Sequence, residues 1–228
     1  MLNKEIHRQK MYNILVDIFS SDLWKYLAFK WWTACYFLHN LDRFSTDLDF
    51  DLIKDKKNID DDIIKILKKY WDVKKGNYNI KLSYGENDMN IKIDINRKIW
   101  KNNSYEIINF YWTDIKVQDK ATLFANKLVA LTERLANRDI YDVYFFIKNS
   151  FDINEEVILE RIWKTTKELF IEIINTLKKL SENTSWWYKI LDWLWEVLKD
   201  EKHKSFVKNK LVKELIWLLE FKVNFSLK

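Results

Sequence analysis

One six-residue segment alternates strictly between acidic and apolar side chains. It reads Asp47-Leu48-Asp49-Phe50-Asp51-Leu52. Because successive side chains of a β-strand point to opposite faces, the segment predicts a strand with three carboxylates on one face. Like charges at that spacing repel one another unless solvent or a cation compensates them. Hard divalent cations such as Mg²⁺ prefer carboxylate oxygens and also hold phosphates, so this strand is a candidate metal site.

The residues before this strand predict a phosphate-binding turn. Residues 27–29 form an apolar run typical of a short buried strand, Lys30 to Thr33 read as a turn, and residues 34–39 predict a helix. Free amides at a helix N-terminus bind phosphate readily. Thr33 can either cap the helix or donate to a phosphate oxygen, and the sequence favours neither.

Residues 29–52 carry a family signature. They resemble the N-terminal signature of the AbiEii-type nucleotidyltransferase toxins, within the DNA polymerase β-like nucleotidyltransferase superfamily. That pattern is Lys-Gly-Gly-Thr-Ala, a short helix, then Arg-x-Ser-x-Asp-x-Asp-Phe. The chain matches it at Lys30, Thr33, Ala34, Arg43, Ser45, Asp47, Asp49 and Phe50. It departs at the two glycines, which would let the backbone approach a triphosphate closely and which here are Trp31 and Trp32.

A third carboxylate comes from the next alternating runs. Residues 79–84 and 89–95 predict a β-hairpin across Gly85, with Asp94 opposite the isoleucine face of its second strand. An exposed polar strand face would explain Asp94 without any function. Two-metal nucleotidyl transfer requires a carboxylate from a neighbouring strand, and the family has one in a similar strand. The resemblance therefore implies that Asp94 joins Asp47 and Asp49.

A third motif spans residues 125–144. It is similar to the family's Ala-x-Lys-x-x-Ala-x-x-x-Arg motif followed by Arg/Lys-Asp-x-Tyr-Asp. Lys127 and Arg134 lie on one side of the predicted helix, where two cations cost energy unless an anion lies between them. A triphosphate bound between them would compensate both charges. Asp139 and Asp142 on the following helix could hold these cations or act as a base; an exposed salt-bridge network is the alternative.

The resemblance, which covers about residues 10–150, implies metal-dependent transfer of a nucleoside monophosphate from a nucleoside triphosphate to an acceptor. Asp47, Asp49 and Asp94 would hold two Mg²⁺ ions, Asp94 would help to deprotonate the acceptor hydroxyl, and Asp142 is a further catalytic candidate. The implied nucleotide-binding residues are Lys30, Thr33, Arg43, Ser45, Lys127, Arg134 and Asp139. Characterised relatives are toxins held in check by an antitoxin, with tRNA as the acceptor, so these partners are implied as well.

Tryptophan is abundant where glycine is scarce. The chain has 12 Trp, 2 Gly and no Pro, whereas average glycine usage of roughly 7% would give about 16. A chain rich in Lys, Ile and Asn suggests an A+T-rich gene, which should deplete Trp because its codon is UGG. We hypothesise that UGA codons translated here as Trp encode glycine in the source organism, notably at Trp31-Trp32 and Trp186-Trp187. The alternative is real aromatic core residues, as expected for Trp163 and Trp217 on apolar helix faces.

The expected fold is α+β (α/β). Residues 1–117 would form a nucleotidyltransferase core with a small mixed sheet, and residues 118–228 a helical domain with helices at 157–180, 188–198 and 205–219. The lone Cys35 fits a reducing cytoplasm, and the sequence shows no signal peptide and no apolar run of about 18 residues. These features predict a cytoplasmic protein with no membrane partner. The scattered histidines give no zinc spacing.

A second functional class stays open. If Trp31 and Trp32 are real, their indoles block the phosphate turn. The chain would then be a catalytically inactive protein that binds nucleic acid or a protein partner. The net charge of +5 allows a local contact with a polyanion without requiring one.

Overall fold

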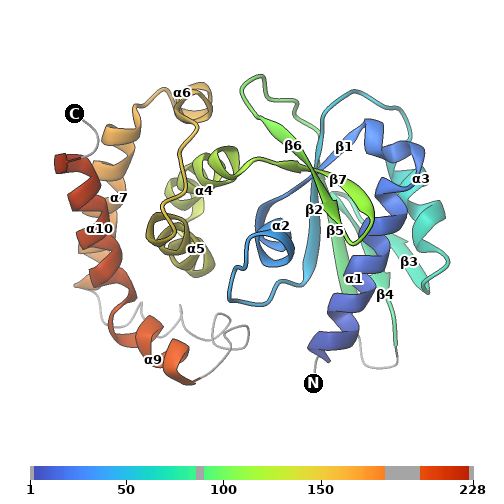
Figure 1. The fold of residues 1–228 in the computed structure, drawn as a ribbon, viewed down its shortest axis with the longest axis horizontal. Coiled ribbons are helices and arrows are strands. Elements are labelled where there is room, and N and C mark those ends of the chain that lie inside the picture. The colour runs from blue at the N-terminus through green and yellow to red at the C-terminus, as the bar shows by residue number, and fades with distance from the viewer. Residues whose placement is uncertain (1–2, 86–89, 183–200, 226–228) are drawn as a thin grey trace. The chain divides into compact units, whose positions relative to one another are not determined.

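The computed structural model describes residues 3–85, 90–182 and 201–225. The chain divides into two compact units, Met1–Asp119 and Lys120–Lys228. The first unit is α+β and the second is helical (Figure 1). This confirms the fold class expected from the sequence.

A seven-stranded mixed sheet organises the described part of the first unit, in the order β3-β4-β5-β2-β1-β7-β6. The strands are β1 (Leu27–Lys30), β2 (Asp47–Leu52), β3 (Asp72–Lys75), β4 (Asn79–Ser83), β5 (Asn90–Asn96), β6 (Tyr105–Phe110) and β7 (Thr113–Gln118). Strand β2 is central, antiparallel to β1 and parallel to β5. The acidic alternating segment is therefore flanked by a strand on each side.

Helices of the first unit pack against this sheet. They are α1 (Lys4–Phe19), the 3₁₀ helix η1 (Asp22–Lys25), α2 (Trp31–Leu38) and α3 (Ile59–Leu67). The core face of β2 carries Leu48 and Phe50, both fully buried. The Phe50 ring lies 5.7 Å from Phe29 of β1 and 6.2 Å from Phe19 of α1, measured between centroids. Burying these residues fixes the register of β2 and so turns its aspartates to the opposite face.

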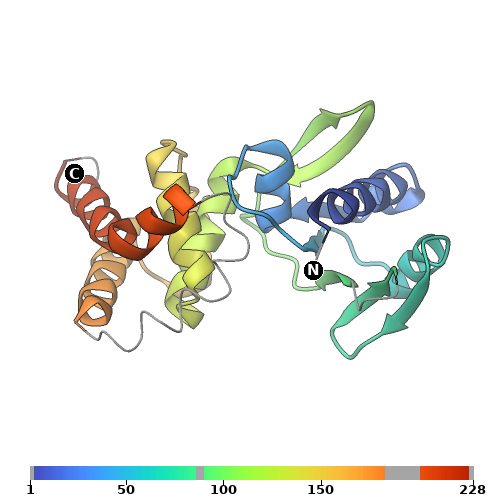
Figure 2. The same ribbon diagram turned by 90° about the horizontal axis from the view of Figure 1, so that it is seen from below.

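The described part of the second unit consists of helices. They are α4 (Lys120–Arg134), α5 (Asn137–Lys148), α6 (Glu155–Ile162), α7 (Thr166–Ser181), α9 (Glu201–Asn209) and α10 (Leu211–Phe225). Figures 1 and 2 both show α10 lying along α7. Leu169, Ile173 and Leu177 of α7 and Leu215 and Leu219 of α10 are buried. The apolar stripes read from the sequence are therefore core.

Two sequence expectations about these helices were wrong. The single helix expected over 157–180 is two helices, because Trp163 adopts a left-handed conformation (φ 58°) and Thr165 starts α7 with a capping box to Glu168. Trp163 therefore ends a helix and is 85% exposed, rather than lying on an apolar face. The helix expected over 205–219 is likewise broken, between α9 and α10. The helix expected over 188–198 and the pair Trp186-Trp187 lie outside the described residues.

No helix in the described ranges combines the length and apolar character needed to span a membrane.

Candidate functional site

Strand pairing aligns three predicted site residues across the sheet. Asp49 of β2 is paired in register with Lys30 of β1 on one side and with Asp94 of β5 on the other. Residues paired in this way point to the same face of a sheet. The structure therefore brings Asp47, Asp49 and Asp94 together on the face opposite the core, as the alternating pattern predicted.

The surroundings of Asp49 disfavour its negatively charged form. Burial raises its pKa to about 6. Lys30 and Lys92 oppose this change, whereas the carboxylates of Asp47 and Asp94 add to it. A carboxyl group in these surroundings gains when a proton or another cation arrives. The strand face is thus electrostatically prepared for a positive ligand.

The donor set fits Mg²⁺ in chemistry but is not gathered as a ligand shell. Carboxylate oxygens are the ligands that Mg²⁺ prefers. Within the described residues, however, no three His, Cys, Asp or Glu side chains are clustered closely enough to hold a metal ion. Asp94 is ion-paired with Lys92, two residues away on the same strand. Lys92 contacts Oδ2 of Asp94, so a metal ion would compete with this ammonium group for that oxygen.

Asp51, the third acidic residue of β2, is a structural centre instead of an open ligand. It is 1% exposed, and Lys30 Nζ lies 2.9 Å from its Oδ1 atom. Its two oxygens also accept hydrogen bonds from Asn96 (3.0 Å), Asn103 (3.0 Å), Tyr105 (3.2 Å) and Gln118 (2.5 Å). Five partners therefore surround the two oxygens of this buried carboxylate.

The expected turn at residues 30–33 is shorter than predicted. Helix α2 begins at Trp31, directly after β1, and its N-cap residue is Lys30, without a side-chain cap. Thr33 therefore does not cap the helix. Its hydroxyl lies 2.7 Å from Ser45 Oγ and also donates to the backbone carbonyl of Asp47. These bonds attach the start of α2 to the start of β2.

The four phosphate-binding candidates of the first unit are all buried. Lys30, Thr33, Arg43 and Ser45 have exposed fractions of 6%, 0%, 1% and 5%. The guanidinium of Arg43 lies 4.9 Å from the centroid of the Trp32 ring, and Lys30 Nζ lies 4.8 Å from the Trp31 ring. The two indoles therefore lie against the two cations expected to bind phosphate.

The remaining candidates form an ion-pair cluster in the second unit. Lys127 Nζ contacts Asp139 and lies 3.7 Å from Asp142 Oδ2, and Arg134 Nε lies 2.8 Å from Asp139 Oδ2. Burial lowers the pKa of Lys127 to about 7, against the pull of both carboxylates. Burial alone would raise the pKa of Asp139, but Lys127 and Arg134 hold it below its usual value. The predicted pair of cations is thus compensated by carboxylates; Lys127, Asp139 and Asp142 are buried, and Arg134 lies at the exposed edge of the network.

Comparison with protein families identifies the chain. The model of the nucleotidyl transferase AbiEii toxin family, type IV toxin–antitoxin system, matches residues 14–193, which is more than half of the chain. The chain belongs to this family. It is accordingly an enzyme of the nucleotidyltransferase class, with an antitoxin as the partner that the family implies. Comparison with curated proteins gave no match.

Solved structures share the fold of this AbiEii family member along nearly its whole length. The JHP933 protein from Helicobacter pylori has a TM-score of 0.62 and 19% identity, covering 98% of this chain and 96% of that one. An antigenic nucleotidyltransferase-like protein from Paracoccidioides brasiliensis has a TM-score of 0.51 and 12% identity, covering 87% and 94%. At these identities the likeness shows the fold alone.

Two features of this AbiEii chain escaped sequence reasoning. Alternation placed Lys92 and Asp94 on one strand face, so their ion pair could have been foreseen. The donors around Asp51 could not, because Asn103 reaches it from the connection before β6 and Gln118 reaches it from β7. Both features change which carboxylates of the strand face are available to a ligand.

Proposed function

We propose that the chain transfers a nucleoside monophosphate from a nucleoside triphosphate to an acceptor hydroxyl, with release of pyrophosphate, at the face formed by Asp47, Asp49 and Asp94. The observation that carries this proposal is the in-register pair Asp49–Asp94 together with the raised pKa of Asp49. An enzyme that handles a triphosphate has to gather cations, and a face of half-buried like charges gathers them. Family membership supplies the reaction class.

Mg²⁺ is the cofactor that this donor set suits. Asp47 and Asp49 would hold it from β2, and Asp94 would hold it from β5, in competition with Lys92. When bound, the metal neutralises charge on the attacking and leaving oxygens of an in-line displacement. Asp94 would also accept the proton of the acceptor hydroxyl. Released Lys92 would then offer its ammonium group to a phosphate oxygen.

The phosphate-binding roles of Lys30, Thr33, Arg43 and Ser45 stay part of this proposal. For Arg43 they require Trp32 to move aside or to be replaced by a smaller residue. Lys127, Arg134 and Asp139 also stay proposed nucleotide-binding residues, and Asp142 stays a further catalytic candidate. We further propose tRNA as the acceptor and the cytoplasm as the compartment, on the basis of family membership.

Isothermal titration calorimetry with each of the four Mg²⁺–nucleoside triphosphates tests the proposal. We expect Asp47→Asn to abolish binding that the unsubstituted chain shows in Mg²⁺. Asp114→Asn is the matched control, because Asp114 lies in β7 and bonds the exposed Asn109. Undiminished Mg²⁺-dependent binding by Asp47→Asn would overturn the metal assignment.

A second candidate function rests on the two indoles. Trp32 is 5% exposed and lies against Arg43, which blocks a predicted phosphate ligand. A chain with this residue in place would be a binding protein that lacks catalysis. Mg²⁺-dependent triphosphate binding by the chain with both tryptophans would exclude this candidate.

A further inference from the structure

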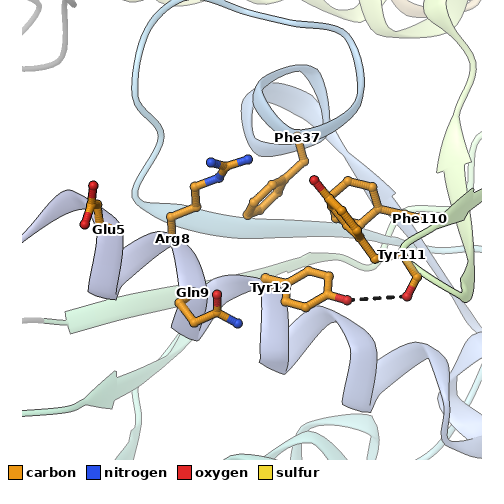
Figure 3. A pocket seen from close by; sticks show the side chains of 7 residues that line it. All are labelled: Glu5, Arg8, Gln9, Tyr12, Phe37, Phe110 and Tyr111. Atoms are coloured by element: carbon orange, nitrogen blue, oxygen red, sulfur yellow. Dashed lines mark hydrogen bonds between the residues drawn. The ribbon is translucent and has the colours of Figure 1, made fainter.

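A cavity of about 460 Å³ opens on the first unit, apart from the carboxylate face (Figure 3). Its walls come from α1, α2 and the turn between β6 and β7. The aromatic side chains in it are Tyr12, Phe37, Phe110 and Tyr111. The polar side chains at its edge are Glu5, Arg8 and Gln9. A volume of this order is typical of pockets that bind small molecules.

The aromatic rings of this cavity pack around Phe110. The Phe110 ring lies 5.6 Å from both Tyr12 and Phe37, and 4.7 Å from Tyr111, measured between centroids. The Tyr12 hydroxyl donates to the Tyr111 carbonyl at 3.4 Å, as drawn in Figure 3. Tyr111 is nevertheless 64% exposed. Its ring is therefore held by its neighbours while a large part of its surface faces solvent.

A cation lies beside these rings. The Arg8 guanidinium lies 5.9 Å from the Phe37 centroid and 5.7 Å from that of Tyr36. Aromatic faces next to an arginine match the chemistry of single-stranded nucleic acid, whose bases stack on rings and whose phosphates attract cations. The carboxylate of Glu5 and the amide oxygen of Gln9, whose nitrogen donates to Asn13, add acceptors for the polar edge of a base.

The same helices adjoin the proposed reaction centre. Helix α2 begins directly after Lys30, which is paired with Asp49. On α1, His7 Nε2 lies 2.8 Å from the carbonyl oxygen of Thr46, the residue before Asp47. The cavity walls and the carboxylate face thus belong to one packed unit.

We propose that this cavity binds a base of a single-stranded RNA acceptor. This inference rests on the proposed function, because it gives the acceptor of that reaction a place on the chain. Tyr111 would stack on the base, Arg8 would attract the adjoining phosphate, and Glu5 and Gln9 would contact the edge of the base. The base bound there would keep the RNA attached while its reactive end reaches the carboxylate face.

Tyr111→Ala tests the proposal, with Tyr78→Ala as the matched control. Tyr78 is 85% exposed and lies outside the cavity. We expect Tyr111→Ala to weaken binding of a short single-stranded oligoribonucleotide about 10-fold or more in fluorescence anisotropy without nucleotide, and Tyr78→Ala to leave it unchanged. Equal affinities for Tyr111→Ala and the unsubstituted chain, or no RNA binding at all, would overturn it.

Mg²⁺–triphosphate binding by the same variants separates this inference from the proposed function. If Tyr111→Ala loses RNA and keeps the triphosphate, both stand. If the chain binds RNA through Tyr111 but binds no triphosphate, the proposed function fails while the base site stands. If the triphosphate binds and RNA binding ignores Tyr111, only the base site fails.

A different observation concerns tryptophan. Eight non-glycine residues in the described ranges have a positive φ, and three of them are Trp31 (61°), Trp112 (70°) and Trp163 (58°). Bulky side chains rarely adopt this region, because Cβ clashes with the backbone there. Glycine enters it at no such cost.

Two of these positions are places where glycine is preferred for known reasons. Trp163 is the left-handed residue that ends α6, which is the usual glycine position. Tyr111 and Trp112 form the two-residue turn between the paired residues Phe110 and Thr113, and both have a positive φ. Such a hairpin turn favours glycine at its second central position. Trp112 and Trp163 are also 97% and 85% exposed, an unusual state for indoles.

We infer that positions 31, 112 and 163 are glycine in the protein made by its source organism, through UGA codons read as glycine. Peptide masses from that organism test this. Trypsin releases residues 31–43 and 102–116 as single peptides, and cleavage after glutamate releases 161–168. We expect glycine masses at the three positions and UGA in the gene. A tryptophan mass, or UGG, at any of the three would overturn the inference for that position.

Discussion

Lys30 Nζ lies 2.9 Å from Asp51 Oδ1, and both side chains are buried. This ion pair joins the end of β1 to β2 on the same face of the sheet as Asp49. It explains how three aspartates on one strand coexist. The charge of Asp51 is compensated by Lys30 inside the protein, whereas the side chains of Asp47 and Asp49 are half-buried. The acidic strand thus carries one structural carboxylate and the two carboxylates that we propose take part in nucleotide transfer.

Removing the charge of Asp51 should destabilise the protein. We expect Asp51→Asn to lower the free energy of unfolding by about 3–5 kcal/mol, because it leaves the Lys30 ammonium buried without its partner. Urea denaturation measures this change. The control is Asp72→Asn, which removes the exposed pair to Lys74 at 3.7 Å and should cost less than about 1 kcal/mol. Equal losses in both variants would contradict the buried-pair account.

Removing the charge of Asp49 should have the opposite effect on stability. Its pKa of about 6 exceeds its usual 3.8, so the folded protein holds the proton more tightly than the unfolded chain does. Stability therefore falls as the pH rises from about 4 to 6, and the loss persists above 6. In metal-free buffer at pH 7, Asp49→Asn should raise the free energy of unfolding by about 1–2 kcal/mol, after allowance for solvent screening. At pH 4 it should change the free energy of unfolding very little. Thermal unfolding at the two pH values measures the gain, and a loss of stability at pH 7 would contradict it.

The cluster in the second unit should matter for folding. We expect Lys127→Met to cost about 3–5 kcal/mol, because Asp139 and Asp142 are both fully buried beside it. Denaturant unfolding provides the measurement. Lys164→Met removes the exposed pair to Glu172 and should change stability by less than about 1 kcal/mol. If Lys127→Met is as stable as the unsubstituted chain, the cluster does not contribute to the fold and its ligand-binding role gains weight.

Glycine substitutions at two exposed tryptophans should shift stability in opposite directions. Trp163→Gly should raise the free energy of unfolding by about 1 kcal/mol, because it relieves a left-handed Cβ. Trp217→Gly should lower it by about 1 kcal/mol, because Trp217 lies inside α10 and glycine weakens a helix interior. Both indoles are exposed, at 85% and 62%, but Trp217 also stacks on Phe221 with ring centroids 6.1 Å apart, and loss of this contact adds to its cost. The same sign in both variants would contradict the backbone argument.

Local patterns predicted the acidic strand and its neighbour. Alternation located β2 and the faces of β5, whereas the helix after β1 begins at Trp31, three residues before the predicted start at Ala34. The break between α6 and α7 was also readable, since Thr165 and Glu168 have capping-box spacing, but the apolar stripe concealed it. The Lys30–Asp51 pair and the donors of Asp51 were not readable. They depend on which strands become neighbours, and that is decided by packing of the whole sheet.

Transfer of labelled nucleotide tests the central claim most directly. The double variant Trp31→Gly, Trp32→Gly, which frees Lys30 and Arg43 from the indoles, is incubated with each α-labelled nucleoside triphosphate and total tRNA. We predict label on RNA with Mg²⁺, none in chelator, and none when Asp49→Asn is added to the same chain. Absence of label with all four nucleotides, or full labelling by the Asp49→Asn form, would contradict nucleotidyl transfer at the carboxylate face.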